Sequence, residues 1–199
     1  MTKHLDHEME ESGPDFSRAP LSHVVSCRDI PAIVDLSPPG MGVPGLILDR
    51  DGVLNLDQQF VAHPIDFQWV EGAKELLFWA GSEGIPVAIV TNQSGIGAGL
   101  YREEDFLALT SWMMSQVPIR LILYCPHAPD ENCSGRKPSP RLVRHAVATL
   151  GMDPARTLMV GDKQSDIDAA RGAGVHPLRF EAGNLYDRVR EAFDPLMTD

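Results

Sequence analysis

Short apolar runs that alternate with amphipathic stretches constrain the fold of this chain more than any other feature. The amphipathic stretches repeat apolar residues with a helical period, as Ala73, Leu76, Leu77 and Ala80 do. The apolar runs lie at residues 45–48, 85–90, 119–124, 157–160 and 175–178, and the predicted helices at 73–80, 103–113, 139–150, 165–173 and 184–193. Buried strands that alternate with helices are typical of a parallel sheet covered on both faces. The sequence therefore predicts an α/β fold with a doubly wound parallel sheet.

The first 40 residues lack this alternation. They mix acidic residues, histidine, proline and serine with short apolar groups such as residues 23–25, and no period is sustained. Such composition favours a flexible or loosely docked segment. We expect an N-terminal extension over residues 1–40 and a single domain over residues 41–199.

The charge balance excludes several classes of function. The chain of 199 residues carries 28 acidic and 17 basic side chains, a formal charge of −11. Such a field repels nucleic acid and anionic membranes, so neither is an expected partner. No apolar run approaches the ~20 residues of a membrane-spanning helix, and the N-terminus lacks the apolar stretch of a secretory signal. Three cysteines argue against a disulfide framework and for a cytoplasmic location.

Chemically useful residues stand at the ends of the predicted strands. In a doubly wound sheet, ligands bind beyond the carboxyl ends of the strands. Asp49, Asp51, Thr91, Lys137 and Asp162 should therefore converge at one edge. Clustered carboxylates repel one another unless a cation lies among them, and hard oxygen ligands suit Mg²⁺. The metal and Lys137 would together offset the charge of a phosphoryl group.

Four ordered motifs occur at these strand ends: DRDGVLN at residues 49–55, TNQSG at 91–95, RKP at 136–138 and GDKQSD at 161–166. They resemble the motifs of haloacid dehalogenase-like phosphatases. The resemblance is closest to the branch containing D-glycero-D-manno-heptose 1,7-bisphosphate 7-phosphatase and the histidinol-phosphatase domain. It spans roughly residues 44–193 and implies a Rossmann-like haloacid dehalogenase core. Only about 35 residues separate the first motif from the second strand, so no large cap domain is expected.

The resemblance also implies a role for each residue. Asp49 would be the nucleophile that forms an aspartyl-phosphate, and Asp51 the general acid and base. The carboxylates of Asp49 and Asp162, with the carbonyl of Asp51, would hold Mg²⁺. Thr91 and Lys137 would bind the phosphoryl oxygens. Implied substrate-binding residues are Asn55, Asp57, Phe60, Asn92, Gln93, Ser94, Arg136 and Lys163. Asp166 and Asp168 are expected at the surface or behind the metal ligands.

The expected function is that of a Mg²⁺-dependent phosphomonoester hydrolase of carbohydrate metabolism, a monomer whose partner is a small phosphorylated metabolite. Heptose 1,7-bisphosphate is the leading substrate, although Ala98 stands where heptose phosphatases usually carry arginine. The alternatives are a phosphatase of histidinol phosphate or another small metabolite, and a non-catalytic, phosphatase-like binding protein. A phosphatase acting on nucleic-acid 3′ ends would need a basic groove, which the charge of −11 disfavours.

Residues 125–138, CPHAPDENCSGRKP, resemble the zinc loop of the same branch, which supplies one histidine and three cysteines. Cys125, His127 and Cys133 stand at ligand positions, but the fourth position is Gly135. Structural zinc takes four ligands. Water, Asp130 or a distant cysteine such as Cys27, otherwise expected to be incidental, could complete the set. A metal-free loop is the alternative.

Overall fold

The computed structural model describes residues 23–34, 36 and 40–198. The strands are β1 (His23–Ser26), β2 (Val43–Leu48), β3 (Val87–Asn92), β4 (Leu121–Cys125), β5 (Met152–Gly161) and β6 (His176–Arg179). The α-helices are α1 (Ala73–Ser82), α2 (Ser94–Gly97), α3 (Glu103–Gln116), α4 (Arg141–Leu150), α5 (Gln164–Ala173) and α6 (Leu185–Met197). Short 3₁₀ turns η2 (Cys27–Asp29), η3 (Pro64–Asp66) and η4 (Pro129–Glu131) lie in the loops.

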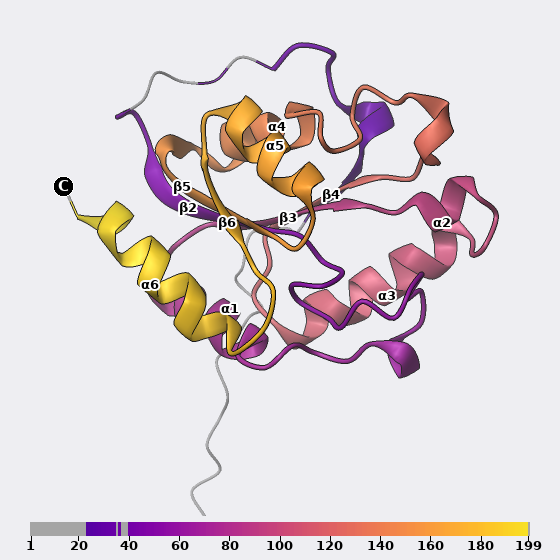
Figure 1. The fold of residues 1–199 in the computed structure, drawn as a ribbon, viewed down its shortest axis with the longest axis horizontal. Helices are drawn as coiled ribbons and strands as arrows, with labels where there is room; N and C mark the ends of the chain where they lie inside the picture. Colours follow the sequence, from indigo (N-terminus) through magenta and orange to yellow (C-terminus); the bar gives the residue numbers. More distant parts are fainter. Residues whose placement is uncertain (1–22, 35, 37–39, 199) are drawn as a thin grey trace, which may run out of the picture.

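The strands form one parallel sheet in the order β1-β4-β3-β2-β5-β6, which confirms the predicted α/β architecture. Helices α4 and α5 cover one face, and α1, α3 and α6 cover the other (Figure 1). Each face has its own apolar core, with Leu46 and Leu48 pointing to one and Ile47 to the other. This alternation along β2 explains why the strand is apolar throughout.

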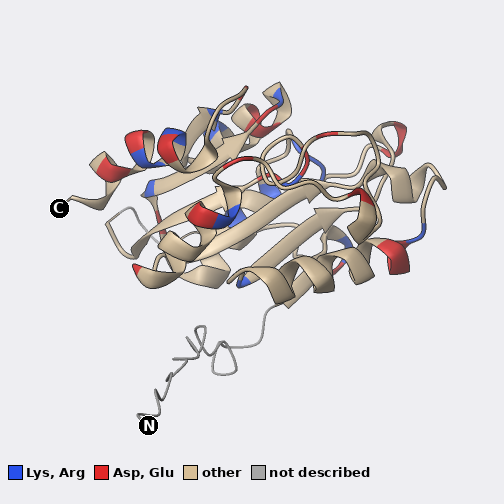
Figure 2. Cartoon of the chain, turned by 90° about the horizontal axis from the view of Figure 1, so that it is seen from below, with Lys and Arg blue, Asp and Glu red and all other residues tan. Residues whose placement is uncertain are grey.

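Strand β2 is the point at which the direction of sheet growth reverses. The chain proceeds from β2 to β3 and β4 on one side, then returns to place β5 and β6 on the other. Crevices at such a switch point open at the carboxyl ends of the strands. The strands in Figure 2 carry few charged residues, whereas the helices and loops carry many.

The N-terminal region differs from the expected extension. Residues 1–22 lie outside the described residues, but His23–Ser26 form edge strand β1, which pairs in parallel with β4. Cys27 and Ile30, which follow it, are buried in the core beneath α4. An edge strand of this length is held by backbone pairing and carries too few side chains for a sequence period to reveal it.

Within the described part of the chain, no helix combines the length and apolar character that crossing a membrane requires.

Candidate active site

Asp49 is the first residue after β2 and lies at the switch point. Its backbone N–H donates to the carbonyl of Val160 at 2.9 Å, so the pairing of β2 with β5 continues through it. The residue is 5% exposed, and its Oδ1 accepts a 2.8 Å hydrogen bond from the backbone N–H of Arg50. Burial raises the pKa of Asp49 to about 6, although the charge of Lys137 opposes this shift.

Lys137 is the buried cation of the site, with 3% of its surface exposed. Its Nζ lies 2.9 Å from Asp49 Oδ1, 2.6 Å from Asp166 Oδ1 and 2.7 Å from the carbonyl oxygen of Val90. Burial alone would lower the pKa of Lys137, but the two carboxylates raise it above its ordinary value. The side chain is therefore a fixed positive charge beside Asp49.

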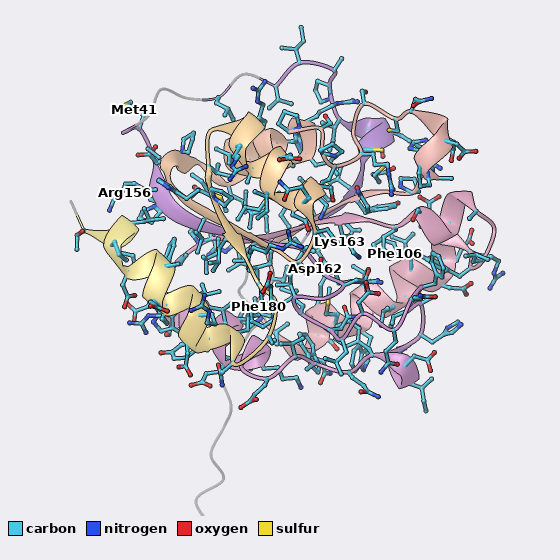
Figure 3. The ribbon with its side chains drawn as sticks, viewed as in Figure 1. Met41, Phe106, Arg156, Asp162, Lys163 and Phe180 are labelled. Carbon is cyan, nitrogen blue, oxygen red and sulfur yellow. The ribbon has the colours of Figure 1, made fainter. Side chains whose placement is uncertain are left out.

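Asp162 follows β5 and approaches the loop after β2 from the other side. Gly52 makes this approach feasible: its φ is +83°, and a Cβ there would lie 2.4 Å from Asp162 Oδ2. Asp162 Oδ1 is buried and has no hydrogen-bond partner among the described residues. Figure 3 shows Asp162 and its neighbour Lys163 together at the carboxyl edge of the sheet.

The carboxylates of Asp49, Asp162 and Asp166 can each place one oxygen within 4.8 Å of the others. Asp166 is already engaged: its Oδ2 accepts from the backbone N–H of Lys163 at 2.9 Å, and its Oδ1 faces Lys137. Lys137 thus lies between Asp49 and Asp166, while Asp162 Oδ2 is 3.8 Å from Nζ of the half-exposed Lys163. Burial raises the pKa of both Asp49 and Asp162. The uncompensated charge and the unpartnered oxygen of Asp162 fit a divalent, oxygen-preferring ion such as Mg²⁺.

Asp51 turns away from these carboxylates toward a set of hydrogen-bond donors. Arg50 Nη2 lies 2.8 Å from both carboxylate oxygens, Asn55 Nδ2 donates at 3.0 Å, and Gln93 Nε2 at 3.1 Å. The Arg50 side chain is buried, and its Nη2 also donates to the carbonyl of Val61 at 2.8 Å. These hydrogen bonds fix the orientation of the Asp51 carboxyl group.

Gln93 belongs to a chain of hydrogen bonds that begins at Tyr101. The Tyr101 hydroxyl donates to Gln93 Oε1 at 2.7 Å, while Gln93 Nε2 donates to Thr91 Oγ1 at 2.8 Å as well as to Asp51. Gly95 gives the tyrosine ring room, because a Cβ there would lie 2.1 Å from Tyr101 Cε1. Tyr101 thus fixes which end of the Gln93 amide faces Asp51.

Three residues expected to touch the substrate, Asn55, Asn92 and Gln93, form hydrogen bonds with protein groups. Asn55 and Gln93 are buried and hold Asp51. Asn92 exchanges two 3.1 Å hydrogen bonds with the backbone of Lys137 and also lines the cavity beside Asp49. All three stand near site residues in sequence because the tight loops that carry those residues need internal amide partners. We therefore describe Asn55 and Gln93 as positioning residues.

A cavity of about 130 Å³ opens beside Asp49. Ser94, Arg136 and Lys163 line it, as expected of substrate contacts. Its full lining is Asp49, Asp51, Thr91, Asn92, Ser94, Arg136, Lys137, Lys163, Ser165 and Asp166. The other two predicted contacts lie beyond the lining: Asp57 Oδ2 pairs with Lys163 Nζ at 2.9 Å, and Phe60 is 51% exposed.

A larger cavity, about 250 Å³, lies between residues 32–34 and the start of α4. Its polar lining consists of serines and two arginines, Arg141 and Arg144, and no carboxylate is among the described residues that line it. The smaller cavity beside Asp49 is therefore the candidate active site.

A second ligand cluster lies at the end of β4. Cys125 Sγ and Cys27 Sγ are each 3.5 Å from His127 Nδ1, and Cys27 Sγ is 3.6 Å from Cys133 Sγ. The ligand atoms of all four side chains lie within 4.8 Å of one another. Cys27 is thus part of the cluster, and the expectation that it is incidental differs from its position in the structure.

Several site residues were given no definite role by the sequence, although each had a local signal. Asp166, expected at the surface or behind the metal ligands, stands in the first turn of α5, four residues after Asp162. Arg50 lies between two assigned aspartates, and Tyr101 follows a glycine-rich turn. Cys27 had the weakest signal, because its neighbours in space are about a hundred residues away in sequence.

The comparisons with known proteins agree with this geometry. The family model of HAD-hydrolase-like proteins matches residues 134–189, which include Lys137, Asp162 and Asp166. A D-glycero-beta-D-manno-heptose-1,7-bisphosphate 7-phosphatase from Haemophilus ducreyi is 40% identical over 147 residues, covering 68% of this chain and 81% of the relative. The protein of the same name from Vibrio cholerae is 41% identical, covering 68% of this chain and 79% of the relative.

Among solved structures, the D,D-heptose 1,7-bisphosphate phosphatase from B. bronchiseptica, complexed with magnesium and phosphate, is 32% identical with a TM-score of 0.66. It covers 74% of this chain and 86% of its own. This chain belongs to the haloacid dehalogenase-like phosphatases. This chain is therefore a phosphatase. Membership of the family also accounts for the aspartate at the switch point and the buried lysine beside it.

Proposed function

We propose that this phosphatase is a Mg²⁺-dependent phosphomonoester hydrolase that acts on a small phosphorylated sugar through an aspartyl-phosphate. The leading substrate is D-glycero-D-manno-heptose 1,7-bisphosphate, attacked at the 7-phosphate. One observation carries the proposal: Asp49 and Lys137 line a cavity at the sheet's switch point, and Asp162 places a carboxylate oxygen within 4.8 Å of one from Asp49. The names of the relatives support the choice of sugar.

Asp49 and Asp162 would hold Mg²⁺ with the carbonyl of Asp51. When bound, the ion supplies charge neutralisation for the carboxylates and the incoming phosphoryl group. Lys137 adds a second fixed positive charge 2.9 Å from the nucleophilic carboxylate. These charges allow an anionic substrate to enter a site that is otherwise strongly negative.

In the first half-reaction, a carboxylate oxygen of Asp49 forms a bond to phosphorus while the bond between phosphorus and the sugar oxygen breaks. The departing alkoxide takes a proton from the carboxyl group of Asp51. Hydrogen bonds from Arg50, Asn55 and Gln93 hold Asp51 in position for this step. Thr91 and the backbone beyond it would bind the phosphoryl oxygens.

In the second half-reaction, ionised Asp51 accepts a proton from water, whose oxygen attacks the phosphorus of the aspartyl-phosphate. The bond between Asp49 and phosphorus then breaks, which releases inorganic phosphate and restores the carboxylate. The same donors hold Asp51 in position for both half-reactions.

The rim of the cavity supports a substrate with further negative charge. The cavity, about 130 Å³, suits a phosphoryl group better than a whole sugar bisphosphate. Arg136 and Lys163 line its mouth and would contact the part of the substrate that remains outside. Asp57, paired with Lys163, and exposed Phe60 would meet the sugar from the loop after Asn55.

We also propose a structural zinc ion bound by Cys125, His127 and Cys133. Thiolate and imidazole ligands suit Zn²⁺ rather than Mg²⁺, and these side chains gather at one end of β4. The same ligands need reduced cysteines, which supports a cytoplasmic location. The strongly negative charge supports a small-molecule partner rather than nucleic acid or an anionic membrane surface. We propose that the protein acts as a monomer in carbohydrate metabolism, since every catalytic group comes from one chain.

A phosphate-release screen tests the proposed function. Purified protein with Mg²⁺ is offered heptose 1,7-bisphosphate, histidinol phosphate, other sugar phosphates and nucleotides, with Asp49→Asn as the inactive control. Clear preference for the heptose supports the proposal. Preference for histidinol phosphate, or equally slow turnover of all substrates, would show that the heptose is not the substrate but would leave the phosphatase mechanism standing. Absence of turnover favours a non-catalytic binding protein.

A further inference from the structure

We propose that Cys27, from the turn after edge strand β1, is the fourth ligand of the zinc site and replaces the side chain that Gly135 lacks. This inference rests on the proposed zinc ion and deepens it. It would make the N-terminal segment part of a metal centre that also includes the loop leading to catalytic Lys137.

The distances between the ligand atoms match a tetrahedral zinc site. With Zn–S near 2.3 Å and Zn–N near 2.0–2.1 Å, tetrahedral geometry places sulfurs about 3.8 Å apart and sulfur and nitrogen about 3.5 Å apart. Cys27 Sγ lies 3.6 Å from Cys133 Sγ and 3.5 Å from His127 Nδ1, and Cys125 Sγ lies 3.5 Å from the same nitrogen. Cys27 therefore stands where a fourth ligand is needed.

Gly135 shows that Cys27 occupies the space of the missing side chain. A Cβ built on Gly135 would lie 2.6 Å from Cys27 Cβ and 3.3 Å from Cys27 Sγ. The backbone of Gly135 does not adopt a positive φ, so its conformation does not require glycine. Cys27 is the residue that leaves no room for a side chain at position 135. The fourth ligand can therefore come from position 27 or from position 135, but not from both.

The position of Cys27 is held by contacts on both sides of it. Strand β1 pairs Ser26 with Tyr124, which brings the next residue alongside Cys125. Beyond the cysteine, Arg141 of α4 donates to the carbonyl oxygens of Ile30 and Pro31, the latter at 2.8 Å.

Arg141 also joins this segment to the zinc loop. Its Nη1 donates to Ser134 Oγ at 2.8 Å, between Cys133 and Gly135. The backbone N–H of Gly135 donates to Cys133 Sγ at 3.3 Å, which fixes the position of the sulfur. A zinc ion held by these ligands would fasten β1 to the loop whose next residues are Arg136 and Lys137.

Moving the ligand back tests the inference. The full chain is compared with Cys27→Gly, with the double variant Cys27→Gly/Gly135→Cys, and with the matched control Cys27→Gly/Gly135→Ala. Glycine at 27 is needed because even an alanine Cβ would remain 2.6 Å from the new Cβ. The readouts are bound zinc per chain, zinc affinity, and the absorption of the Co²⁺-substituted protein.

We expect one zinc per wild-type chain. Cys27→Gly should lose more than about 100-fold in zinc affinity, because changing even the partners of ligands costs about 10- to 100-fold. Its Co²⁺–thiolate absorption should fall by about one third, since two of three thiolates remain. The Gly135→Cys double variant should recover both values, and the Gly135→Ala control should recover neither.

The failures can be told apart. If wild-type protein binds no zinc, the zinc proposal and this inference both fall, while the phosphatase proposal is judged by the substrate screen. If wild type binds zinc and Cys27→Gly binds it equally well, the zinc loop stands and Cys27 is not its ligand. If Cys27→Gly loses zinc and the Gly135→Cys variant stays empty despite a native circular dichroism spectrum, the exchange between the two positions is wrong.

Discussion

The oxygen cluster at the centre of the sheet and the sulfur cluster at its edge differ in what surrounds their ligands. In the oxygen cluster, the carboxylates of Asp49, Asp162 and Asp166 lie together, and Asp49 and Asp166 share a buried lysine and line a cavity. In the sulfur cluster, one imidazole and three thiols gather without a lysine among them and lie outside the lining of that cavity. The first is built to exchange what it binds, the second to retain it.

The two clusters also differ in how the chain supplies them. The oxygen ligands follow β2 and β5, central strands whose order the fold itself dictates. The sulfur ligands combine one loop with a segment about a hundred residues away at the sheet edge. A catalytic centre must keep its ligands on the same strands, whereas a structural centre can take an equivalent ligand from any element that reaches it.

The largest difference is expected from Asp49→Asn. This change removes the nucleophile while preserving shape, and should lower phosphate release by at least about 10³-fold. Zinc content should be unchanged, because Asp49 takes no part in the sulfur cluster. Asp168→Asn, on the exposed side of α5, is the matched control and should retain wild-type turnover. More than a few per cent residual activity in Asp49→Asn would refute the nucleophile assignment.

Metal removal should separate the two clusters next. Brief chelation should abolish phosphatase activity, because the oxygen cluster is open to solvent through the cavity. Added Mg²⁺ should restore activity, and added Zn²⁺ alone should not. Metal analysis of the same samples should show zinc still bound after the magnesium has gone. Full activity after thorough chelation would contradict a metal role for Asp49 and Asp162.

The oxygen cluster should also respond to pH between 5 and 7. Burial raises the pKa of Asp49 from 3.8 to about 6, so protons compete with Mg²⁺ for this carboxylate. Because the metal binds the ionised form, the half-saturating Mg²⁺ concentration should rise as the pH falls, by about tenfold from pH 7 to pH 5. Titration of activity with Mg²⁺ at each pH measures it, and an unchanged concentration would show that Asp49 is not the competing group.

The sequence predicted that Asp49, Lys137 and Asp162 would converge, because the two aspartates directly follow strands and Lys137 lies in the loop after β4. Parallel strands align their carboxyl ends, which brings these residues to one edge of the sheet. Asp166, inside α5, was not placed among the ligands in this way. The roles of Asn55 and Gln93 could not be predicted in this way. Whether an amide faces a substrate or a neighbouring carboxylate depends on the path of a tight loop, which sequence motifs do not specify.

Prediction was poorest at the edge of the sheet. The central strands are apolar throughout, but β1 has only four residues and buries little apart from Ser26. Its place beside β4 is determined by backbone pairing and by the contacts of Arg141 with Ile30 and Pro31. These interactions leave no period in the sequence. Because the sequence carries no signal for β1, it also could not place Cys27 in the cluster. The neighbours of Cys27 become known only when β1 is paired with β4.

The smallest effect is expected from Tyr101→Phe, which tests how finely the oxygen cluster is positioned. The change removes the 2.7 Å hydrogen bond from the tyrosine hydroxyl to Gln93 Oε1 and leaves the ring in place beside Gly95. Gln93 can then rotate, and its amide no longer holds Asp51 firmly. We expect kcat to fall about fivefold, equivalent to about 1 kcal/mol, with little change in KM or in the Mg²⁺ requirement. Zinc content should stay constant, because the hydrogen-bond chain ends at Asp51 and Thr91. If KM rises and kcat is unchanged, Tyr101 binds the substrate rather than positioning the acid–base residue.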